Sequence, residues 1–112
     1  MLNRCIELAS QLQNRKQRIA SIITDKKGRI LSFGVNSYTK SHPKMAHYSA
    51  KFNDFNKIYL HSEMDSLVKL NQQGHSIYVA RVDKRGNPLP CKPCRICALA
   101  LNDAKIFNIY HT

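Results

Sequence analysis

The sequence lacks an apolar run long enough to cross a bilayer, because no window approaches the roughly 20 apolar residues that a membrane span needs. Residues 1–18 also lack the apolar stretch of a secretory signal. No internal repeat, low-complexity segment or linker interrupts the 112 residues. A chain of this length can form one domain with a core and is too short for two ordinary ones. We therefore predict a single cytoplasmic domain, residues 1–112, that makes no contact with a membrane.

Acidic residues are scarce. Seven Asp and Glu residues stand against 18 Lys and Arg residues, which gives a formal net charge of +11 at pH 7. A positive field of this size favours partners that carry phosphate, either nucleotides or polynucleotides. Charge alone does not separate a nucleotide enzyme from a nucleic-acid-binding protein. Glutamate is the rarer acid, and occurs only as Glu7 and Glu63.

Cysteine is also infrequent, and three of its four positions lie close together: Cys5, Cys91, Cys94 and Cys97. This three-plus-one distribution is poor material for a disulfide framework. It suits a metal site in a reducing compartment. Cys5 falls on the apolar face of a predicted helix, so we expect it to be a small core residue.

Apolar spacing and turn residues predict secondary structure in the order αββαβαβ. The predicted elements are a helix over 2–14, strands over 19–24 and 29–36 forming a hairpin, a helix from Leu60 to near Gly74, a strand over 75–82, a helix from Pro93 and a strand over 105–110. The strands that follow the hairpin through helical crossovers are expected to be parallel. Ligand chemistry should then lie at their carboxyl ends.

Residues 37–59 show no clear periodicity, although 44–52 are compatible with a short helix. Five of the nine aromatic residues lie in this stretch among several Lys and His residues: Tyr38, Tyr48, Phe52, Phe55 and Tyr59. Aromatic rings interleaved with cations suit stacked bases and phosphates. A solvated loop whose aromatic rings fill gaps in the core is the alternative, and both interpretations stay open.

A metal motif is formed by His61-Ser62-Glu63 together with the later segment Pro90-Cys91-Lys92-Pro93-Cys94. Catalytic zinc sites usually have three protein ligands and leave the fourth position to water, whereas structural sites use four. The predicted ligands are His61, Cys91 and Cys94. Both halves of the motif are predicted at helix N-termini, where the helix dipole favours the thiolate form of cysteine that binds metal.

Each half of this motif also has an interpretation without catalysis. Ser62 followed by Asp65 is compatible with a helix capping box. A lone C-x-x-C suits redox chemistry or half of a structural zinc site, with Cys97 as an extra ligand. The combination of spacing, proline and helix starts favours zinc.

The arrangement H-x-E followed by P-C-x-x-C resembles the signature of the zinc-dependent cytidine deaminase superfamily. It is most similar to the branch that contains deoxycytidylate and tRNA adenosine deaminases. Gly34-Val35-Asn36 also resembles that family's Gly-x-Asn at the end of the second strand. The resemblance covers nearly the whole chain and implies a three-layer α-β-α fold with a mixed central sheet.

The resemblance further implies that zinc-bound hydroxide attacks the amino-bearing ring carbon while Glu63 shuttles protons. The leading substrate is a cytosine nucleotide of the deoxycytidylate type. A deaminase acting on polynucleotide cytosine or adenine, and a non-catalytic zinc module that binds nucleic acid, are the alternatives. Relatives assemble into oligomers, so a homo-oligomer is expected.

The resemblance also carries residues over to substrate binding, namely Asn36, Ser62 and Pro90. Lys40 and His42, just beyond Asn36, are candidate phosphate ligands. Ser62 departs from the family's usual alanine and adds a hydroxyl to the pocket. Cys97 is an additional thiol, and we expect it to pack in the core and not to bind metal.

Overall fold

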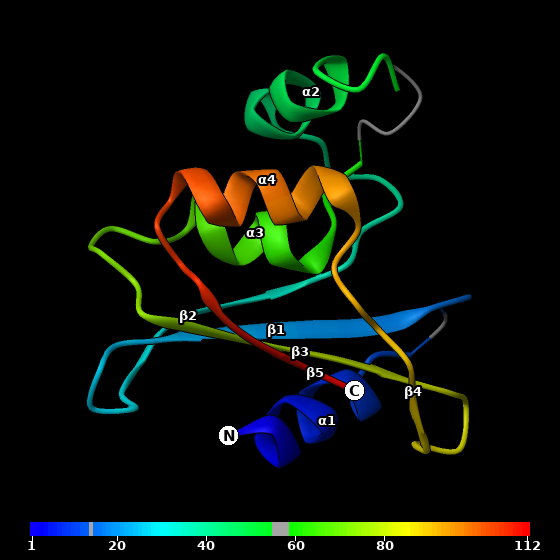
Figure 1. The fold of residues 1–112 in the computed structure, drawn as a ribbon. Helices are drawn as coiled ribbons and strands as arrows, with labels where there is room; N and C mark the ends of the chain where they lie inside the picture. Colours follow the sequence, from blue (N-terminus) through cyan, green and yellow to red (C-terminus); the bar gives the residue numbers. More distant parts are fainter. Residues whose placement is uncertain (14, 55–58) are drawn as a thin grey trace.

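The computed structural model describes residues 1–13, 15–54 and 59–112. A five-stranded sheet separates one helix from three others (Figure 1). In chain order the elements are α1 (Leu2–Ser10), β1 (Arg18–Thr24), β2 (Ile30–Val35), α2 (Pro43–Ala50), α3 (Ser62–Val68), β3 (Ser76–Val82), β4 (Pro88–Leu89), α4 (Arg95–Asp103) and β5 (Asn108–His111). The predicted three-layer α-β-α fold is confirmed.

The sheet is mixed, as predicted. β1 pairs antiparallel with both β2 and β3. The other edge of β3 is shared by two strands, since β5 pairs parallel with Ser76–Val79 and β4 pairs antiparallel with Arg81 and Val82. β2, β3 and β5 therefore run in one direction, which confirms the prediction that the strands after the hairpin are parallel.

Alternation along β1 divides its side chains between two apolar clusters. Ala20 and Ile22 pack with Cys5 and Ala9 of α1. Ile23 points to the opposite face and joins the larger cluster beneath α3 and α4. Cys5 is fully buried, as predicted, and burial raises the pKa of its thiol to about 12. The sheet is thus covered on both faces, which explains why β1 is almost continuously apolar.

The larger cluster lies between the sheet and helices α2, α3 and α4. Its buried members include residues from all three helices and from β3, such as Met45, Met64, Ile77, Val79, Ile96 and Leu101. α2 forms the outermost part of this layer (Figure 1). The Tyr48 hydroxyl donates to Asp103 Oδ2 at 2.8 Å and links α2 to α4. Burial and this hydrogen bond raise the pKa of Tyr48.

Several element boundaries differ from the predictions. α1 ends at Ser10 instead of residue 14, and α3 ends at Val68, well before Gly74. α2 begins at Pro43 because His42 Nδ1 accepts a hydrogen bond from the Lys44 N–H and caps the helix. α4 begins at Arg95 because Cys94 is extended. No helix in the described parts of the chain has the length and apolarity to span a membrane.

Candidate metal centre and pocket

Gly34 positions α3, the helix that begins directly after His61 and carries Glu63. A Cβ atom at Gly34 would lie 2.4 Å from the Ser62 carbonyl oxygen and 2.5 Å from the Ser66 amide nitrogen. Backbone atoms cannot rotate out of the way as side chains can, so any larger residue here would displace α3 from β2. The first turn of α3 therefore rests directly on the backbone of β2.

Buried serines then fix this turn against β1. Ser21 Oγ donates to the Ser62 carbonyl oxygen at 2.7 Å and lies 2.9 Å from Ser66 Oγ. Ser66 Oγ donates to the Glu63 carbonyl oxygen at 2.8 Å. On the β2 side, Asp65 Oδ2 accepts from the Val35 N–H at 3.0 Å. Buried polar groups that are fully paired hold a single arrangement, and here they fix the backbone on both sides of Glu63.

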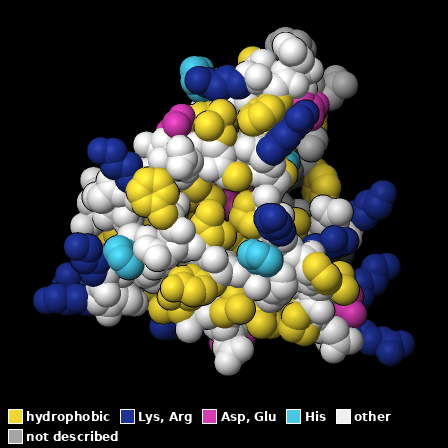
Figure 2. All heavy atoms as spheres, in the orientation of Figure 1, with side chains coloured by type: hydrophobic (Ala, Val, Ile, Leu, Met, Phe, Trp, Pro, Cys, Tyr) yellow, Lys and Arg dark blue, Asp and Glu magenta, His cyan; other side chains and the backbone are white. Residues whose placement is uncertain are grey.

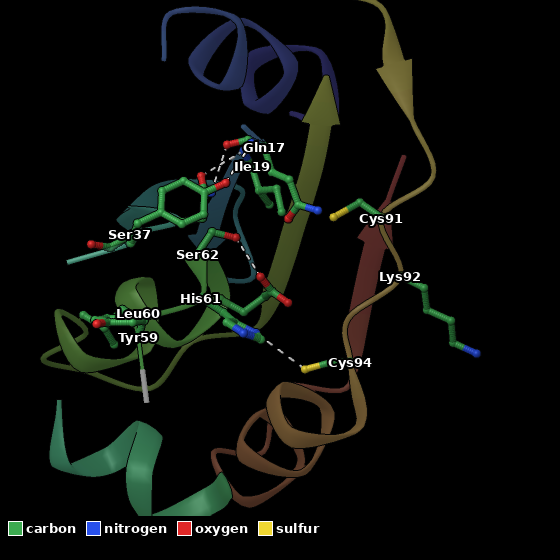
Figure 3. Close-up of a pocket in the computed structure, with 13 residues that line it drawn as sticks. Gln17, Ile19, Ser37, Tyr59, Leu60, His61, Ser62, Cys91, Lys92 and Cys94 are labelled. Carbon is green, nitrogen blue, oxygen red and sulfur yellow. Dashed lines mark hydrogen bonds between the residues drawn. The ribbon is translucent and has the colours of Figure 1, made fainter. Parts of the chain in front are cut away.

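Three metal-binding atoms converge at the start of this helix and of α4. His61 Nδ1 lies 3.6 Å from Cys94 Sγ (Figure 3). It lies 3.5 Å from Cys97 Sγ. The three ligand atoms all lie within 4.8 Å of one another. In tetrahedral zinc sites the usual Zn–N and Zn–S bond lengths place nitrogen and sulfur about 3.5 Å apart. The donor set and its spacing therefore fit zinc.

The sulfur atoms beside His61 are not the pair predicted from the sequence. Cys97, which was expected to pack in the core, belongs to the three-donor cluster, whereas Cys91 lies outside it. The chain contains P-C-x-x-C twice in overlapping form, and the second copy is Pro93-Cys94-Arg95-Ile96-Cys97. Because α4 starts at Arg95, Cys94 is its N-cap and Cys97 lies in its first turn. The second copy was the sequence signal for Cys97.

The two clustered thiols differ in proton affinity. The hydrogen bond with Cys97, followed by that with His61, lowers the pKa of Cys94 to about 3 despite burial. The same hydrogen bond, together with burial and the charge of Glu63, raises the pKa of Cys97 strongly. The opposite shifts mean that the pair holds one shared proton much more tightly than a second one. Metal binding has to displace the shared proton, because the thiolate is the form that binds metal.

A cavity of about 360 Å³ opens beside this cluster. This volume lies within the range of small-molecule sites. His61, Glu63 and Cys94 line it, whereas Cys97 is fully buried and is not among the lining residues. Cys91 also lines the cavity and points its sulfur toward it, while the Lys92 side chain points away (Figure 3). Burial, followed by the charge of Glu63, raises the pKa of Cys91 to about 11.

Glu63 and Ser62 form the part of the wall nearest the metal-binding atoms. Both side chains are buried, and Ser62 Oγ donates to Glu63 Oε1 at 2.7 Å. The Ser62 hydroxyl, which replaces the methyl group of the family's usual alanine, therefore holds one oxygen of the Glu63 carboxylate. Both residues line the cavity, and their roles as proton shuttle and substrate contact stay predictions.

Asn36 lines the same cavity, with its side chain already hydrogen-bonded. Its Oδ1 accepts from the Ile19 N–H at 3.1 Å and its Nδ2 donates to the Gln17 carbonyl at 3.0 Å. Arg15 donates to the Asn36 carbonyl oxygen. Asn36 thus fastens the segment before β1 to the end of β2. The second Nδ2 proton and the second acceptor position of Oδ1 stay available for a ligand.

The mouth of the cavity includes residues that were not singled out as site residues from the sequence. Gln17 lines it, and its backbone N–H donates to the Tyr38 hydroxyl at 2.8 Å. Tyr38 and Tyr59 line it too, and each is 47% exposed. The only sequence signal was the aromatic-rich stretch 37–59. Phe55 of that stretch lies outside the described residues.

Three predicted substrate contacts do not line the cavity. His42 caps α2, and its Nδ1 is used by the Lys44 N–H. The Lys40 carbonyl accepts from the Leu60 N–H at 2.9 Å, which joins the loop after β2 to the segment before α3. Pro90 is exposed and lies directly before Cys91. Their roles in substrate binding stay predictions.

The sequence profile of one protein family matches residues 1–112, the whole chain. That family is described as the cytidine and deoxycytidylate deaminase zinc-binding region. The chain belongs to this deaminase family. The prediction of zinc as cofactor is thereby confirmed, because the matched region is zinc-binding and the structure gathers three suitable donors.

Solved structures agree with this deaminase family at the level of the fold. Cytidine deaminase from Mycobacterium tuberculosis aligns with a TM-score of 0.61 and 14% identity, over 100% of this chain and 80% of that one. The Mycobacterium leprae cytidine deaminase gives 0.59 and 14%, over 93% and 76%. Acinetobacter baumannii RibD gives 0.55 and 18%, over 99% of this chain and 26% of that one. Comparison with curated protein sequences finds no match.

Proposed function

We propose that this deaminase-family protein hydrolyses the amino group of a cytosine nucleotide, with deoxycytidylate as the leading substrate. The observation that carries the proposal is that Glu63 lines one cavity together with two of the three clustered metal-binding residues, His61 and Cys94. Glu63 is only 5% exposed, yet it lines that cavity with His61 and Cys94. A buried carboxylate beside a three-donor zinc site is the arrangement that hydrolytic deamination requires.

In this proposal His61, Cys94 and Cys97 hold the metal. Zinc held by these residues would lower the pKa of a bound water to about 7 and so supply hydroxide at neutral pH. Glu63 would take one proton from the attacking water and pass it to the ring nitrogen. It would then carry the proton of the newly formed C–OH group to the amine, so that the C–N bond breaks, the ring keeps a carbonyl and ammonia leaves. Asn36 and the Ser62 backbone N–H orient the nucleoside. Ammonia and the corresponding uracil nucleotide are the products.

Replacement of Glu63 tests this function. We expect Glu63→Gln to abolish ammonia release from deoxycytidylate while the bound zinc, measured by elemental analysis, stays at the wild-type level. The matched control is Glu7→Gln, which changes the only other glutamate, an exposed residue of α1. Undiminished turnover by Glu63→Gln, or absence of turnover in the zinc-loaded wild type, would overturn the proposal.

A polynucleotide substrate is the second candidate, and it is favoured by the surface. Lys and Arg side chains project along both margins of the face in Figure 2. Tyr38 and Tyr59 are half-exposed at the mouth of the cavity, where they are available for stacking against neighbouring bases. Assaying deoxycytidylate and a single-stranded oligonucleotide side by side separates the two candidates.

The remaining expectations concern assembly and location. A homo-oligomer fits a family whose relatives assemble, and sedimentation of the zinc-loaded protein measures it. The non-catalytic alternative requires a fourth protein ligand, and Cys91 is the nearest thiol available in sequence. A zinc centre with four protein ligands and no water would support that alternative. The cytoplasmic location stays a prediction.

A further inference from the structure

Arg81 lies on the pocket side of the sheet, beside the cavity. The register of β1 and β3 pairs Arg81 with Ile19, and Ile19 lines the cavity. Side chains alternate along β3, so Arg81 is on the same face as Ile77 and Val79. Those two residues pack in the cluster beneath α3 and α4. The Arg81 side chain is therefore on the face of the sheet that α3 and α4 cover, and the metal-binding atoms lie on this same side.

Arg81 is also close to Cys91, which lines the cavity. The Arg81 charge opposes the effects of burial and of Glu63 that raise the pKa of the Cys91 thiol. The backbone supports this proximity. Thr112 Oγ1 accepts from the Arg81 N–H at 3.1 Å, and the Thr112 carbonyl accepts from the Cys91 N–H at 2.9 Å. Arg81 thus lies between two lining residues, Ile19 on one side and Cys91 on the other.

The Arg81 guanidinium has no partner among the described residues. Its Nε is buried and makes no hydrogen bond there, and no ion pair within the described part of the chain includes it. The acid nearest in sequence, Asp83, uses its carboxylate to accept from the Arg85 and Asn87 N–H groups. Buried donors are normally paired, so the Arg81 Nε is a donor that an anion entering from outside the chain would satisfy.

Arg18 gives the internal comparison. It precedes Ile19 on β1, pairs with Val82, and shares the face of Ala20 and Ile22, opposite the pocket. Its Nε is likewise buried without a partner, but its Nη1 donates to the Lys84 carbonyl at 3.3 Å. Arg18 and Arg81 therefore lie at the same end of the sheet but on opposite faces. Of the two, Arg18 has a guanidinium that is hydrogen-bonded to a described residue.

We infer that Arg81 binds the phosphate group of the substrate and so makes the site select nucleotides over nucleosides. The inference rests on the proposed function, whose substrate class it names. A guanidinium presents two parallel N–H donors that match phosphate oxygens. Lys92 is the only Lys or Arg among the described lining residues, and its side chain points away from the cavity (Figure 3). Arg15, another arginine in this region, already donates to the carbonyl oxygen of the lining residue Asn36. Arg81 is thus a cation beside the cavity whose guanidinium makes no such bond among the described residues.

Two assays on Arg81→Gln and its matched control Arg18→Gln test the inference. The first compares kcat/KM for deoxycytidine and deoxycytidylate, with zinc loading checked in each protein. Wild type should prefer the nucleotide by at least about tenfold, and Arg81→Gln should lose about 10- to 100-fold on the nucleotide, the usual range for hydrogen bonds to charged groups. Turnover of deoxycytidine should change little in Arg81→Gln, which also shows that the variant folds. Arg18→Gln should retain the preference.

The second assay is calorimetric titration of deoxycytidylate into Glu63→Gln, with and without Arg81→Gln. Weaker binding on loss of Arg81, with no equivalent loss for deoxycytidine, supports the inference without any turnover. Equal turnover of deoxycytidine and deoxycytidylate by wild type overturns the phosphate inference alone. Arg81-dependent binding without any deamination overturns the proposed function alone. If Arg81→Gln and Arg18→Gln weaken binding and turnover of deoxycytidylate equally, the loss of one positive charge anywhere on the protein explains the result. That outcome would refute the inference.

A third substrate identifies the source of the phosphate. A single-stranded oligonucleotide with one cytosine offers phosphodiester groups in place of a terminal phosphate. If the oligonucleotide is the better substrate and Arg81→Gln reduces its turnover, Arg81 reads a phosphate of the strand. If only deoxycytidylate depends on Arg81, it reads the monoester of a free nucleotide. Both results support the inference, and independence of both substrates from Arg81 refutes it.

Discussion

The Ser62 hydroxyl donates a hydrogen bond of 2.7 Å to Oε1 of Glu63, the next residue in the chain. Both side chains are buried, at 1% and 5% exposure, so solvent does not weaken the interaction. The adjacent backbone is held by Ser21 and Ser66. The direction of one carboxylate oxygen is therefore fixed relative to α3, and with it the position of the proposed proton shuttle.

Ser62→Ala removes this hydrogen bond and leaves the backbone in place. We expect kcat for deoxycytidylate to fall by about tenfold, because the Glu63 carboxylate gains rotational freedom. KM and zinc content should change little. The control is Ser32→Ala, which removes a buried hydrogen bond to the Ser66 carbonyl oxygen and should lower the free energy of unfolding by about 1 kcal/mol without affecting kcat of the zinc-loaded protein. Wild-type kcat in Ser62→Ala would contradict the proposed positioning of Glu63.

The ligand set is tested by two matched serine substitutions. Cys97→Ser should lose zinc on dialysis against a mild chelator, because it removes a donor 3.5 Å from His61 Nδ1. Cys91→Ser should keep zinc, since Cys91 is outside the three-donor cluster. Elemental analysis gives the metal content, and the absorption of the cobalt-substituted protein reports thiolate ligation. The reverse result would instead establish His61, Cys91 and Cys94, the set predicted from the sequence.

Zinc uptake should depend on pH through Cys97. Its hydrogen bond to Cys94 and its burial raise the pKa of Cys97, whereas the pKa of Cys94 is lowered to about 3. Between about pH 7 and 8, uptake of each ion should therefore release about one proton from these thiols. Higher pH removes the competing proton, so zinc affinity should increase by about tenfold per pH unit. Zinc titrations in weak buffer measure the protons released, and affinity independent of pH would contradict the expectation.

Gly34→Ala should destabilise the fold by about 1–3 kcal/mol, as overpacking typically does. The new methyl group would meet backbone atoms of Ser62 and Ser66 at 2.4 and 2.5 Å. Gly74→Ala is the comparison, because a Cβ atom there would meet only side-chain atoms, the nearest being Ile23 Cγ2 at 2.6 Å. Thermal unfolding of the two variants should show the larger loss for Gly34→Ala. Equal losses would mean that α3 adjusts its position on β2 easily.

Much of the fold follows from local patterns. The buried run over β1, the turn before β2 and the apolar stripe of α4 are strong periodic signals that tertiary packing reinforces. Helix ends are weaker signals. The apolar spacing from Leu60 did not reveal that His61 is extended and that α3 begins only at Ser62. Propensity does not settle such ends when a few hydrogen bonds decide them.

The metal-binding cysteines show where sequence reasoning stops. Two copies of P-C-x-x-C share Cys94, so the pattern alone does not select Cys91 or Cys97 as its partner. The start of α4 distinguishes them, because it places Cys97 in the first turn and leaves Cys91 on the loop. The sequence also did not identify Arg81 as a candidate site residue. Its relation to the cavity depends on pairing with Ile19, which lies far away in the chain.

The position of the three donors has a consequence for folding. His61 directly precedes α3, the helix that rests on β1 and β2. Cys94 and Cys97 lie at the start of α4. The segment between them contains β3, the strand that pairs with β1, β4 and β5. Metal ligation would therefore close a loop of the chain that includes β3 and act as a cross-link that restricts the unfolded chain. Metal supply would then govern how cooperatively the two halves of this small protein unfold.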